Sequence, residues 1–229
     1  MISIVIPIYN GIEYINSSVS SVLSQTYNDW ELIIGVNGHP KDSEVYYEAK
    51  KFEQLSIVEN KITVLDLYYI KGKANALNHM IQHCQGNYIA LLDVDDIWHI
   101  DKLYFQSMFI HRYDVIGSKC IYFGDINGVV PNIPVGNISD IDFREGNPII
   151  NSSVLIRKEL CQWEENGIED YDLWLRLRSQ NKTFYNDNNV LVYHRIHRES
   201  AFNSKGHNEK LAELFFKYSN SDELTQLNI

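Results

Sequence analysis

Apolar and polar positions fall into alternating blocks along the first half of the chain. Short apolar runs rich in β-branched residues have the length and composition of buried strands, and the segments between them repeat apolar residues at helical spacing. Strands are expected at 2–8, 30–36, 61–66 and 87–92, and helices at 12–25, 43–55 and 73–84. Strands that alternate with helices of this length predict an α/β fold with a mainly parallel sheet flanked by helices.

The pattern in the second half is less regular and predicts a mixed continuation of the same sheet. Strands are expected at 114–123, 152–157 and 190–193, and helices at 102–110, 170–179 and 208–218. Residues 128–146, with three prolines in or near them, are expected to form a long loop, and the polar tail 219–229 is expected to be frayed. No segment resembles a linker, so we expect a single domain over residues 1–229.

The last predicted helix has one apolar face. Its members recur at helical spacing and are Leu211, Leu214, Phe215 and Tyr218. We expect this face to pack on the domain, and a contact between two copies in a homodimer is the alternative.

Composition narrows the classes of function. A net charge of -10 argues against nucleic-acid binding, because phosphate neutralisation needs clustered Lys and Arg. The cysteines Cys84, Cys120 and Cys161 form no CxxC pair, which indicates a reducing, cytoplasmic compartment in which they serve as small core residues. The apolar start MISIVIPIYN lacks a basic leader, and no stretch approaches the roughly 20 apolar residues of a membrane helix. We therefore expect neither a signal peptide nor a membrane span.

Polar residues follow three of the predicted strands at the point where each strand ends. They occupy residues 7–10, 37–38 and 93–96. Ligands of open parallel sheets bind outside the carboxyl ends of the strands. The three loops are therefore expected to form one crevice.

The segment LLDVDDIW gathers three carboxylates, those of Asp93, Asp95 and Asp96. Adjacent carboxylates repel one another and are costly to desolvate, so a partly buried group of them indicates that a cation binds there. Oxygen ligands suit Mg²⁺ or Mn²⁺, which commonly bridge a carboxylate to substrate phosphates. The alternative is a solvated turn in which Asp95 or Asp96 caps a helix that begins near His99.

A second acidic pair, Glu169 and Asp170, precedes the apolar helical stripe of Leu173, Trp174 and Leu177. Acids in the first turn of a helix stabilise it by roughly 0.3 to 1 kcal/mol through the helix dipole. A carboxylate that stays ionised at neutral pH can instead accept a proton from an acceptor hydroxyl. The residues alone favour neither account.

A third cluster, YHRIHRESAFN, follows a predicted strand and contains two histidines and two arginines. Alternation along an extended segment would place Arg195 and His197 on one face, where they could meet a diphosphate and its metal. The alternative is a solvated basic loop. The sequence pattern indicates no such role for His194 or Arg198.

Six segments in the same order resemble the inverting family 2 glycosyltransferases, which have a GT-A fold. They are SIVIPIYNGIEYI, SVLSQTYNDWELII, GKANALNHMI with GNYIALLDVDDIW, SSVLIRKEL, IEDYDLWLRL and YHRIHRESA. The resemblance spans about residues 2–203. It implies one GT-A catalytic domain with a nucleotide-binding half at about 1–98, an acceptor half at about 99–205 and a C-terminal helix at about 206–219.

The resemblance implies a set of donor-binding residues. They are Pro7, Tyr9, Asn10, Asn37, Lys73, Asn75, Asp93 and Arg195. One position departs from the family, which usually has two aspartates and Gly-Ser after the second strand, where this chain has Val36-Asn37-Gly38-His39. Because an asparagine both accepts and donates, Asn37 suits uracil, guanine or cytosine.

The resemblance also implies the catalytic and metal-binding residues. Asp95 matches the second acid of the DxD motif, usually the metal ligand, and Asp96 beside it is implied as an assisting group. His197 matches a late residue that joins the metal shell. Asp170 matches the general base. Glu169 and Trp174 adjoin it and are the implied acceptor-binding residues.

The expected function is therefore that of an inverting hexosyl- or N-acetylhexosaminyltransferase. It would move a sugar from a nucleoside diphosphate sugar, with a UDP-sugar favoured, to a glycan or other hydroxyl acceptor with the help of Mn²⁺ or Mg²⁺. A nucleotidyltransferase is an alternative, although PIYNGIEYI lacks the glycine-rich loop with Arg and Lys of that class. A degenerate subunit that binds a sugar nucleotide or glycan, and a module of a longer protein, are further alternatives.

Overall fold

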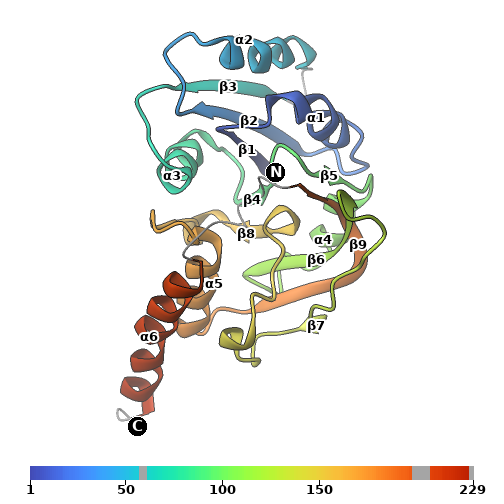
Figure 1. Ribbon diagram of the computed structural model, residues 1–229. Coiled ribbons are helices and arrows are strands. Elements are labelled where there is room, and N and C mark those ends of the chain that lie inside the picture. Colours follow the sequence, from blue (N-terminus) through green and yellow to red (C-terminus); the bar gives the residue numbers. More distant parts are fainter. Residues whose placement is uncertain (57–60, 198–206, 227–229) are drawn as a thin grey trace.

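Nine strands form one mixed sheet in the computed structural model, which describes residues 1–56, 61–197 and 207–226 (Figure 1). The strands lie in the order β3-β2-β1-β4-β8-β6-β9-β5, and β7 pairs with β9. Their bounds are β1 Ile2–Ile8, β2 Trp30–Asn37, β3 Ile62–Leu67, β4 Tyr88–Leu91, β5 Ile97–Trp98, β6 Val115–Gly124, β7 Gly136–Asn137, β8 Leu155–Arg157 and β9 Phe184–Ile196.

The first four strands run parallel to one another. β1 lies between β2 and β4, with Ile2 opposite both Trp30 and Tyr88, and β3 pairs with the far side of β2. Every residue of β2 is buried, as expected for a strand covered on both faces. The carboxyl ends of β1, β2 and β4 therefore meet at one edge, where the sequence predicts the crevice.

The remaining strands give the sheet its mixed character. β8 pairs antiparallel with both β4 and β6, and β6 pairs parallel with β9. The short strands β5 and β7 are antiparallel to β9. β9 thereby carries the end of the 184–196 segment back to the turn that follows β4.

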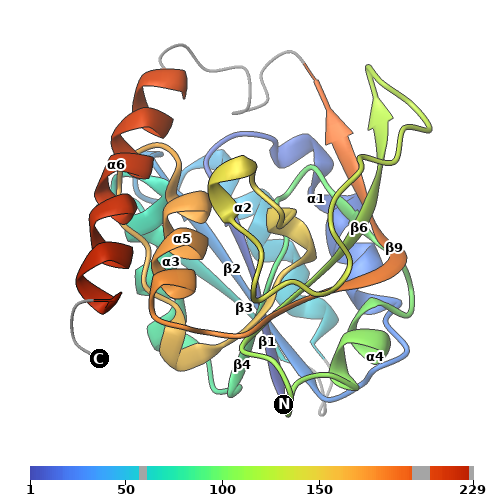
Figure 2. The same cartoon turned by 90° about the horizontal axis from the view of Figure 1, so that it is seen from below.

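Helices cover both faces of the sheet. Their bounds are α1 Ile15–Leu23, α2 Glu44–Lys50, α3 Lys73–His83, α4 Lys102–Ser107, α5 Glu169–Ser179 and α6 His207–Gln226, with 3₁₀ turns η1 Ile12–Tyr14, η2 Lys51–Leu55, η3 Phe143–Glu145, η4 Asn151–Ser153 and η5 Lys158–Leu160. One hydrophobic cluster packs α3, α5 and α6 on one face, and a second packs α1, α2 and α4 on the other (Figures 1 and 2). The predicted α/β class with flanking helices is confirmed.

β9 is longer than its apolar pattern predicts. It begins at Phe184, whereas the expected strand covers only 190–193. Asn186 and Asp187 have the composition of a loop, yet both are buried. The side-chain amide of Asn186 donates to the carbonyl oxygens of Pro134 and Pro148 at 2.8 Å each, so distant loops accept both of its N–H donors.

Other bounds also differ from expectation. α6 is helical to Gln226, so the predicted frayed tail begins within a helix. The strand expected at 152–157 is shortened by η4, and the helix expected at 102–110 ends as an α-helix at Ser107. Arg198, the rest of the 198–206 segment and the tail residues 227–229 lie outside the described residues.

The apolar face of α6 packs on α5, which confirms the prediction that it packs on the domain. Leu214 and Tyr218 are buried in the same cluster as Tyr171, and the Tyr218 hydroxyl donates to the Asp172 carboxylate at 2.5 Å. The three cysteines are buried and unpaired, which agrees with their predicted core role. Among the described residues, no helix combines the length and apolar character needed to cross a membrane.

Candidate functional site

Asp93 lies just past the end of β4, where three side chains hold its carboxylate. Lys73 Nζ donates to Oδ1 at 2.7 Å. Asn151 Nδ2 and Ser152 Oγ donate to Oδ2 at 3.0 and 3.3 Å, and the Asp93 N–H donates to Ser152 Oγ at 3.0 Å. The carboxylate is therefore fixed between the start of α3 and the turn η4.

Lys73 and Asp93 hold one another in their charged forms. Burial acts to raise the pKa of Asp93, but the Lys73 charge and the hydrogen bonds from Lys73 and Asn151 lower it overall. Burial likewise acts to lower the pKa of Lys73, and the carboxylates of Asp93 and Asp170 raise it overall. Because the Lys73 side chain is 45% exposed, solvent screens part of this attraction. Lys73 is thus a cation that acts on both Asp93 and Asp170.

Asp96 is fully buried and fastens the turn after β4 to β9. Its Oδ2 lies 2.9 Å from His194 Nδ1, and its Oδ1 accepts from the Arg195 N–H at 2.7 Å. Burial acts to lower the pKa of His194, but the hydrogen bond and charge of Asp96 raise it overall. The sequence pattern predicts no role for His194, and it offers a helix cap as one role of Asp96. The structure gives the pair a different role, which is to link two distant segments.

Asp95 directs its carboxylate at His197. Asp95 Oδ2 lies 2.9 Å from His197 Nε2, and the two side chains are 24% and 29% exposed. Burial and the charges of Asp93 and Asp96 raise the pKa of Asp95, and the hydrogen bond with His197 opposes this only in part. A cation bound at Asp95 would relieve this excess of negative charge.

Arg195 crosses the same turn from β9. Its Nε donates to the Asp95 carbonyl oxygen at 3.0 Å. Its guanidinium lies 4.3 Å from the ring centres of both Tyr14 and Phe123, whose faces favour a cation. The structure therefore brings Arg195 and His197 to the same aspartate.

Glu169 and Asp170 begin α5, close to the charge of Lys73. Burial raises the pKa of Asp170, the Lys73 charge and the Tyr171 N–H lower it in part, and the net shift is upward. Glu169 Oε1 accepts from the Gly167 N–H at 2.8 Å, which shapes the turn that leads into the helix. A carboxylate with a raised pKa is a stronger base than a free one.

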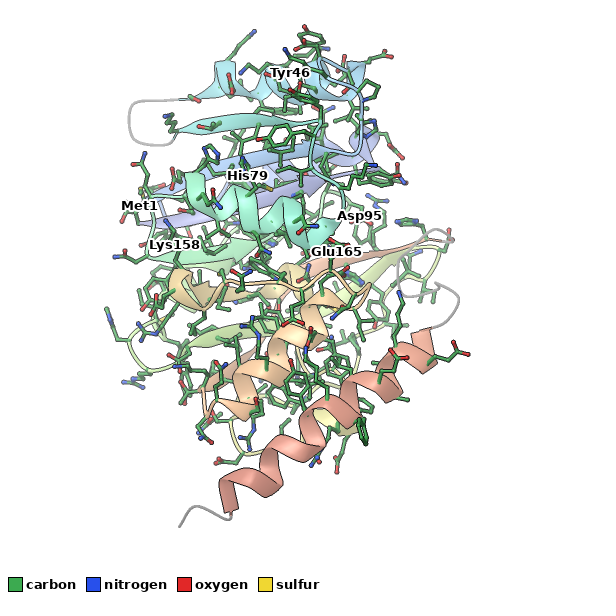
Figure 3. All side chains as sticks on the ribbon, turned by 90° about the vertical axis from the view of Figure 1, so that its left-hand side faces the viewer. Met1, Tyr46, His79, Asp95, Lys158 and Glu165 are labelled. Carbon is green, nitrogen blue, oxygen red and sulfur yellow. The ribbon has the colours of Figure 1, made fainter. Side chains whose placement is uncertain are left out.

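Glu165 joins the segment before α5 to the start of α3. Its Oε2 accepts from the N–H groups of Ala74 and Asn75 at 3.1 and 3.4 Å. A Cβ added to Gly72, whose φ is +88°, would stand 2.0 Å from this carboxylate, so glycine is needed for the approach. Figure 3 shows Asp95 and Glu165 toward one end of the molecule, opposite Met1 and Lys158. No local sequence signal identifies Glu165, because its partners lie about 90 residues earlier.

Asn78 makes a second connection between the same two segments. Its Nδ2 donates to the Trp163 carbonyl oxygen at 2.8 Å, and its Oδ1 accepts from the Trp163 N–H at 2.9 Å. The chain leading to Asp170 is thus attached to α3 at two points, one turn apart.

The loops after β1 and β2 lie against each other. Tyr9 is 59% exposed, and a Cβ on Gly38, at φ +78°, would stand 2.2 Å from its ring. Asn37 is buried, and its Nδ2 donates to the Gly72 carbonyl oxygen at 3.3 Å. One of the two N–H donors of the Asn37 amide is therefore engaged within the protein.

The remaining predicted site residues lie in β1, in the loop after β1, in α3 and in α5. Pro7 lies within β1 opposite Gly35, and Asn10 is exposed in the loop after it. Asn75 Nδ2 donates to the Lys71 carbonyl oxygen at 2.9 Å. Trp174 has no exposed surface and lies in the core, so the structure does not support its predicted contact with an acceptor.

Asp95 and His197 could together offer a metal ion one oxygen and one nitrogen donor. Across the residues that the structure describes, no group of three or more His, Cys, Asp or Glu side chains is arranged to hold an ion. Mg²⁺ and Mn²⁺ commonly use one or two protein ligands and take the rest from phosphates and water. The donor set fits an ion of that kind and lacks the ligands of a closed structural site.

Comparisons with known proteins agree with the family and the fold that the sequence resembles. The family model described as "Glycosyl transferase family 2" matches residues 3–156. The Escherichia coli protein UDP-Glc:alpha-D-GlcNAc-diphosphoundecaprenol beta-1,3-glucosyltransferase WfgD is 29% identical over 223 residues, which cover 90% of this chain and 81% of WfgD.

Two solved structures share the fold. S. aureus TarS 1–349 in complex with UDP-GlcNAc matches with a TM-score of 0.73 at 16% identity, over 96% of this chain and 66% of that one. The mannosyltransferase PcManGT from Pyrobaculum calidifontis, in complex with GDP-Man and Mn²⁺, matches with a TM-score of 0.72 at 12% identity, over 96% and 68%. This chain therefore spans about two thirds of the length of these solved chains.

Proposed function

The chain belongs to glycosyl transferase family 2 and is a glycosyltransferase with the GT-A fold, and we propose that it is an inverting, metal-dependent enzyme of one catalytic domain. Its donor is a nucleoside diphosphate sugar, and its acceptor is a hydroxyl of a glycan or related molecule. A UDP-sugar is favoured because WfgD is named for UDP-Glc and the TarS structure contains UDP-GlcNAc. The transferred group is a hexose or an N-acetylhexosamine.

One observation carries the proposal, and it is the position of Lys73 between two sets of carboxylates. Its ammonium pairs with Asp93, in the turn that precedes β5, and its charge also acts on Asp170, at the start of α5. The proposed donor site and the proposed base therefore share one electrostatic environment. A transfer reaction needs this proximity, because donor and acceptor must be held in line.

Asp95 and His197 are the proposed ligands of the divalent cation, Mn²⁺ or Mg²⁺. When bound, the cation would neutralise the charge that develops on the departing diphosphate. The Asp93 carboxylate is already compensated by Lys73, which leaves Asp95 as the acidic group with a raised pKa. Arg195 adds a fixed positive charge beside the same turn.

The nucleotide is proposed to bind over the loops after β1 and β2. Tyr9 offers an exposed ring for the base, and Gly38 lets that ring lie close to the second loop. One N–H of the Asn37 amide donates to Gly72, and the Asn37 carbonyl is proposed to meet the base as an acceptor. Uracil presents an N–H donor that suits this acceptor. Pro7, Asn10 and Asn75 are proposed to line the same region.

Asp170 is the proposed general base. Its raised pKa makes the ionised carboxylate a better proton acceptor than a free one. It would take the proton of the acceptor hydroxyl as that oxygen attacks the anomeric carbon from the side opposite the diphosphate, so the configuration inverts. Glu169 is proposed to contact the acceptor beside it.

Glu165 is proposed as a positioning residue. Its hydrogen bonds to the start of α3 fix the segment that delivers Asp170 relative to Lys73. This role requires no contact between Glu165 and either substrate.

A transfer assay with paired controls tests the proposal. The protein is incubated with UDP-Glc, UDP-GlcNAc or GDP-Man, with Mn²⁺, Mg²⁺ or EDTA, and release of the nucleotide is measured together with thermal stabilisation. We expect release and stabilisation with a UDP-sugar that require the cation. Stabilisation without any release, even with a panel of sugar acceptors, would favour a binding subunit, and full activity in EDTA would refute metal dependence.

A further inference from the structure

Two histidines lie one turn apart on α3, away from the proposed donor site. His79 and His83 occupy positions i and i+4, so their side chains share one face of the helix. Figure 3 labels His79 on this helix. His83 is exposed and His79 is half-buried, so solvent ions reach the pair.

The two ring nitrogens are spaced as ligands of one metal ion would be. His79 Nε2 lies 3.4 Å from His83 Nε2, and the ring centres are 5.2 Å apart with the planes inclined at 50°. Zinc binds imidazole nitrogen at about 2.0–2.1 Å in tetrahedral geometry, which sets two such nitrogens about 3.3–3.4 Å apart. We propose that His79 and His83 form a second cation site, for a divalent transition metal that prefers nitrogen ligands, such as Zn²⁺.

Tyr69 completes the polar surroundings of the pair. Its hydroxyl hydrogen-bonds with His79 Nε2 at 3.2 Å, and its ring meets the His79 ring edge-on at 5.9 Å between centres. When a metal occupies Nε2, this hydroxyl is released to hydrogen-bond with a water on the metal. The remaining coordination positions are filled by water, since the protein supplies two nitrogens.

The site differs from the proposed catalytic site in both place and ligand chemistry. His79 lies six positions after Lys73, which corresponds to about 9 Å along the helix axis. Imidazole pairs select Zn²⁺, Cu²⁺ or Ni²⁺, whereas carboxylate and phosphate oxygens select Mg²⁺ or Mn²⁺. The inference therefore does not depend on the proposed function.

Binding at this site stabilises the folded protein. α3 ends at His83, so one ion ties the last residue of the helix to the preceding turn. Any ion that binds the folded chain more tightly than the unfolded chain raises the free energy of unfolding in proportion to the logarithm of its concentration.

Calorimetric titration and thermal unfolding with Zn²⁺ test the inference. We expect the wild type to show one Zn²⁺-binding event that His83→Gln weakens by about tenfold or more. His111→Gln, which replaces an exposed histidine outside α3, serves as the matched control and leaves the event unchanged. Mn²⁺ and Mg²⁺ give no event that depends on His83.

Anomalous scattering from a crystal soaked in Zn²⁺ identifies the site directly. A peak within bonding distance of both Nε2 atoms supports the inference. It is overturned if His83→Gln binds Zn²⁺ as the wild type does, or if the anomalous peaks lie only elsewhere, such as beside Asp95. Circular dichroism without metal checks that the variant is folded.

Discussion

Asp95 Oδ2 lies 2.9 Å from His197 Nε2, although the two residues are 102 positions apart in the chain. The contact joins the turn that follows β4 to the end of β9. The sheet order, in which β9 pairs with β5 directly after this turn, makes the contact possible. A proposed metal site is thus assembled from the two halves of the fold.

Replacement of Asp95 is expected to remove metal-dependent turnover. Asp95→Ala deletes the only proposed carboxylate ligand, so kcat/KM should fall by about 10²-fold or more and Mn²⁺ should no longer stimulate activity. The measurement is the rate of nucleotide release against Mn²⁺ concentration. Asp140→Asn changes an exposed aspartate and should behave as the wild type. If the Asp95→Ala enzyme kept an unchanged Mn²⁺ requirement, the metal would be bound by other residues.

Asp170→Asn is expected to separate donor binding from transfer. The amide keeps the shape and the hydrogen bond from the Tyr171 N–H but cannot accept a proton, so transfer should fall by about 10²- to 10⁴-fold. The donor affinity, measured by calorimetry, should change little. Near wild-type transfer in this variant would show that Asp170 is not the general base.

The same variant makes a prediction for stability. Because the folded protein raises the pKa of Asp170, the ionised carboxyl is less favourable in the folded than in the unfolded chain. Asp170→Asn should therefore be more stable than the wild type near pH 7. This advantage should shrink as the pH falls through the raised pKa and the carboxyl becomes neutral. Urea unfolding of both proteins at several pH values measures this difference in the free energy of unfolding. A difference that does not change with pH would show that the raised pKa of Asp170 is not its cause.

Glu165→Ala is expected to impair the acceptor step more than donor binding. Loss of the hydrogen bonds to α3 frees the segment before Asp170 and removes a helix cap, which should cost about 1 kcal/mol of stability and about tenfold in kcat. Glu165→Gln retains an accepting oxygen and should recover most of kcat. The donor KM should stay near the wild-type value in both variants.

Glu164→Gln is the matched control for this prediction. It removes the ion pair between Glu164 and Lys217, which lies on the surface and should contribute little. Equal losses in the variants at 164 and 165 would show that the segment responds to any change of charge, and the positioning role of Glu165 would fail.

Lys102 is expected to make stability depend on pH. Its side chain is fully buried, and its Nζ donates to Gln106 Oε1 at 2.7 Å and lies 4.1 Å from the Trp98 ring centre. Burial places the pKa of Lys102 well below the ordinary 10.5. Between that lowered pKa and 10.5, the unfolded chain binds one more proton than the folded one. The free energy of unfolding should therefore rise with pH, relative to Lys102→Met, by up to about 1.4 kcal/mol per pH unit.

Urea unfolding of both proteins at pH 8 and pH 9 measures this difference. Lys61→Met, which replaces an exposed lysine, should show no such change. A constant difference between wild type and Lys102→Met across these pH values would mean that Lys102 is charged in the folded protein.

The hydrophobic pattern predicts the first four strands to within one residue at each end, because buried parallel strands are continuous apolar runs bounded by polar loops. It does not predict the start of β9. The buried side-chain amide of Asn186 donates to carbonyl oxygens of other segments, and Asp187 accepts from Asn189 two residues later; a hydropathy pattern does not reveal such partners. Tertiary hydrogen bonding thus overrides local composition at Asn186.

In the candidate site, too, the sequence reveals some residues and not others. Asp93, Asp95 and Asp170 stand out in the sequence because acidic residues beside apolar runs are unusual. Glu165 and His194 do not, since each is recognised only through a partner about 90 to 100 positions away. Trp174 illustrates the opposite error, because its motif suggests a binding surface while its side chain fills the core.

The contacts between β9 and the acidic turn also bear on how a nascent chain acquires its crevice. The carboxylates of Asp95 and Asp96 leave the ribosome about 100 residues before their histidine partners. At ordinary rates of synthesis this interval lasts on the order of 5–20 s. β1 to β4 can associate during that time, whereas β9 must close a long loop before it pairs. Folding on the ribosome would therefore complete the pairing of β1 to β4 first and the turn of the proposed cation site last.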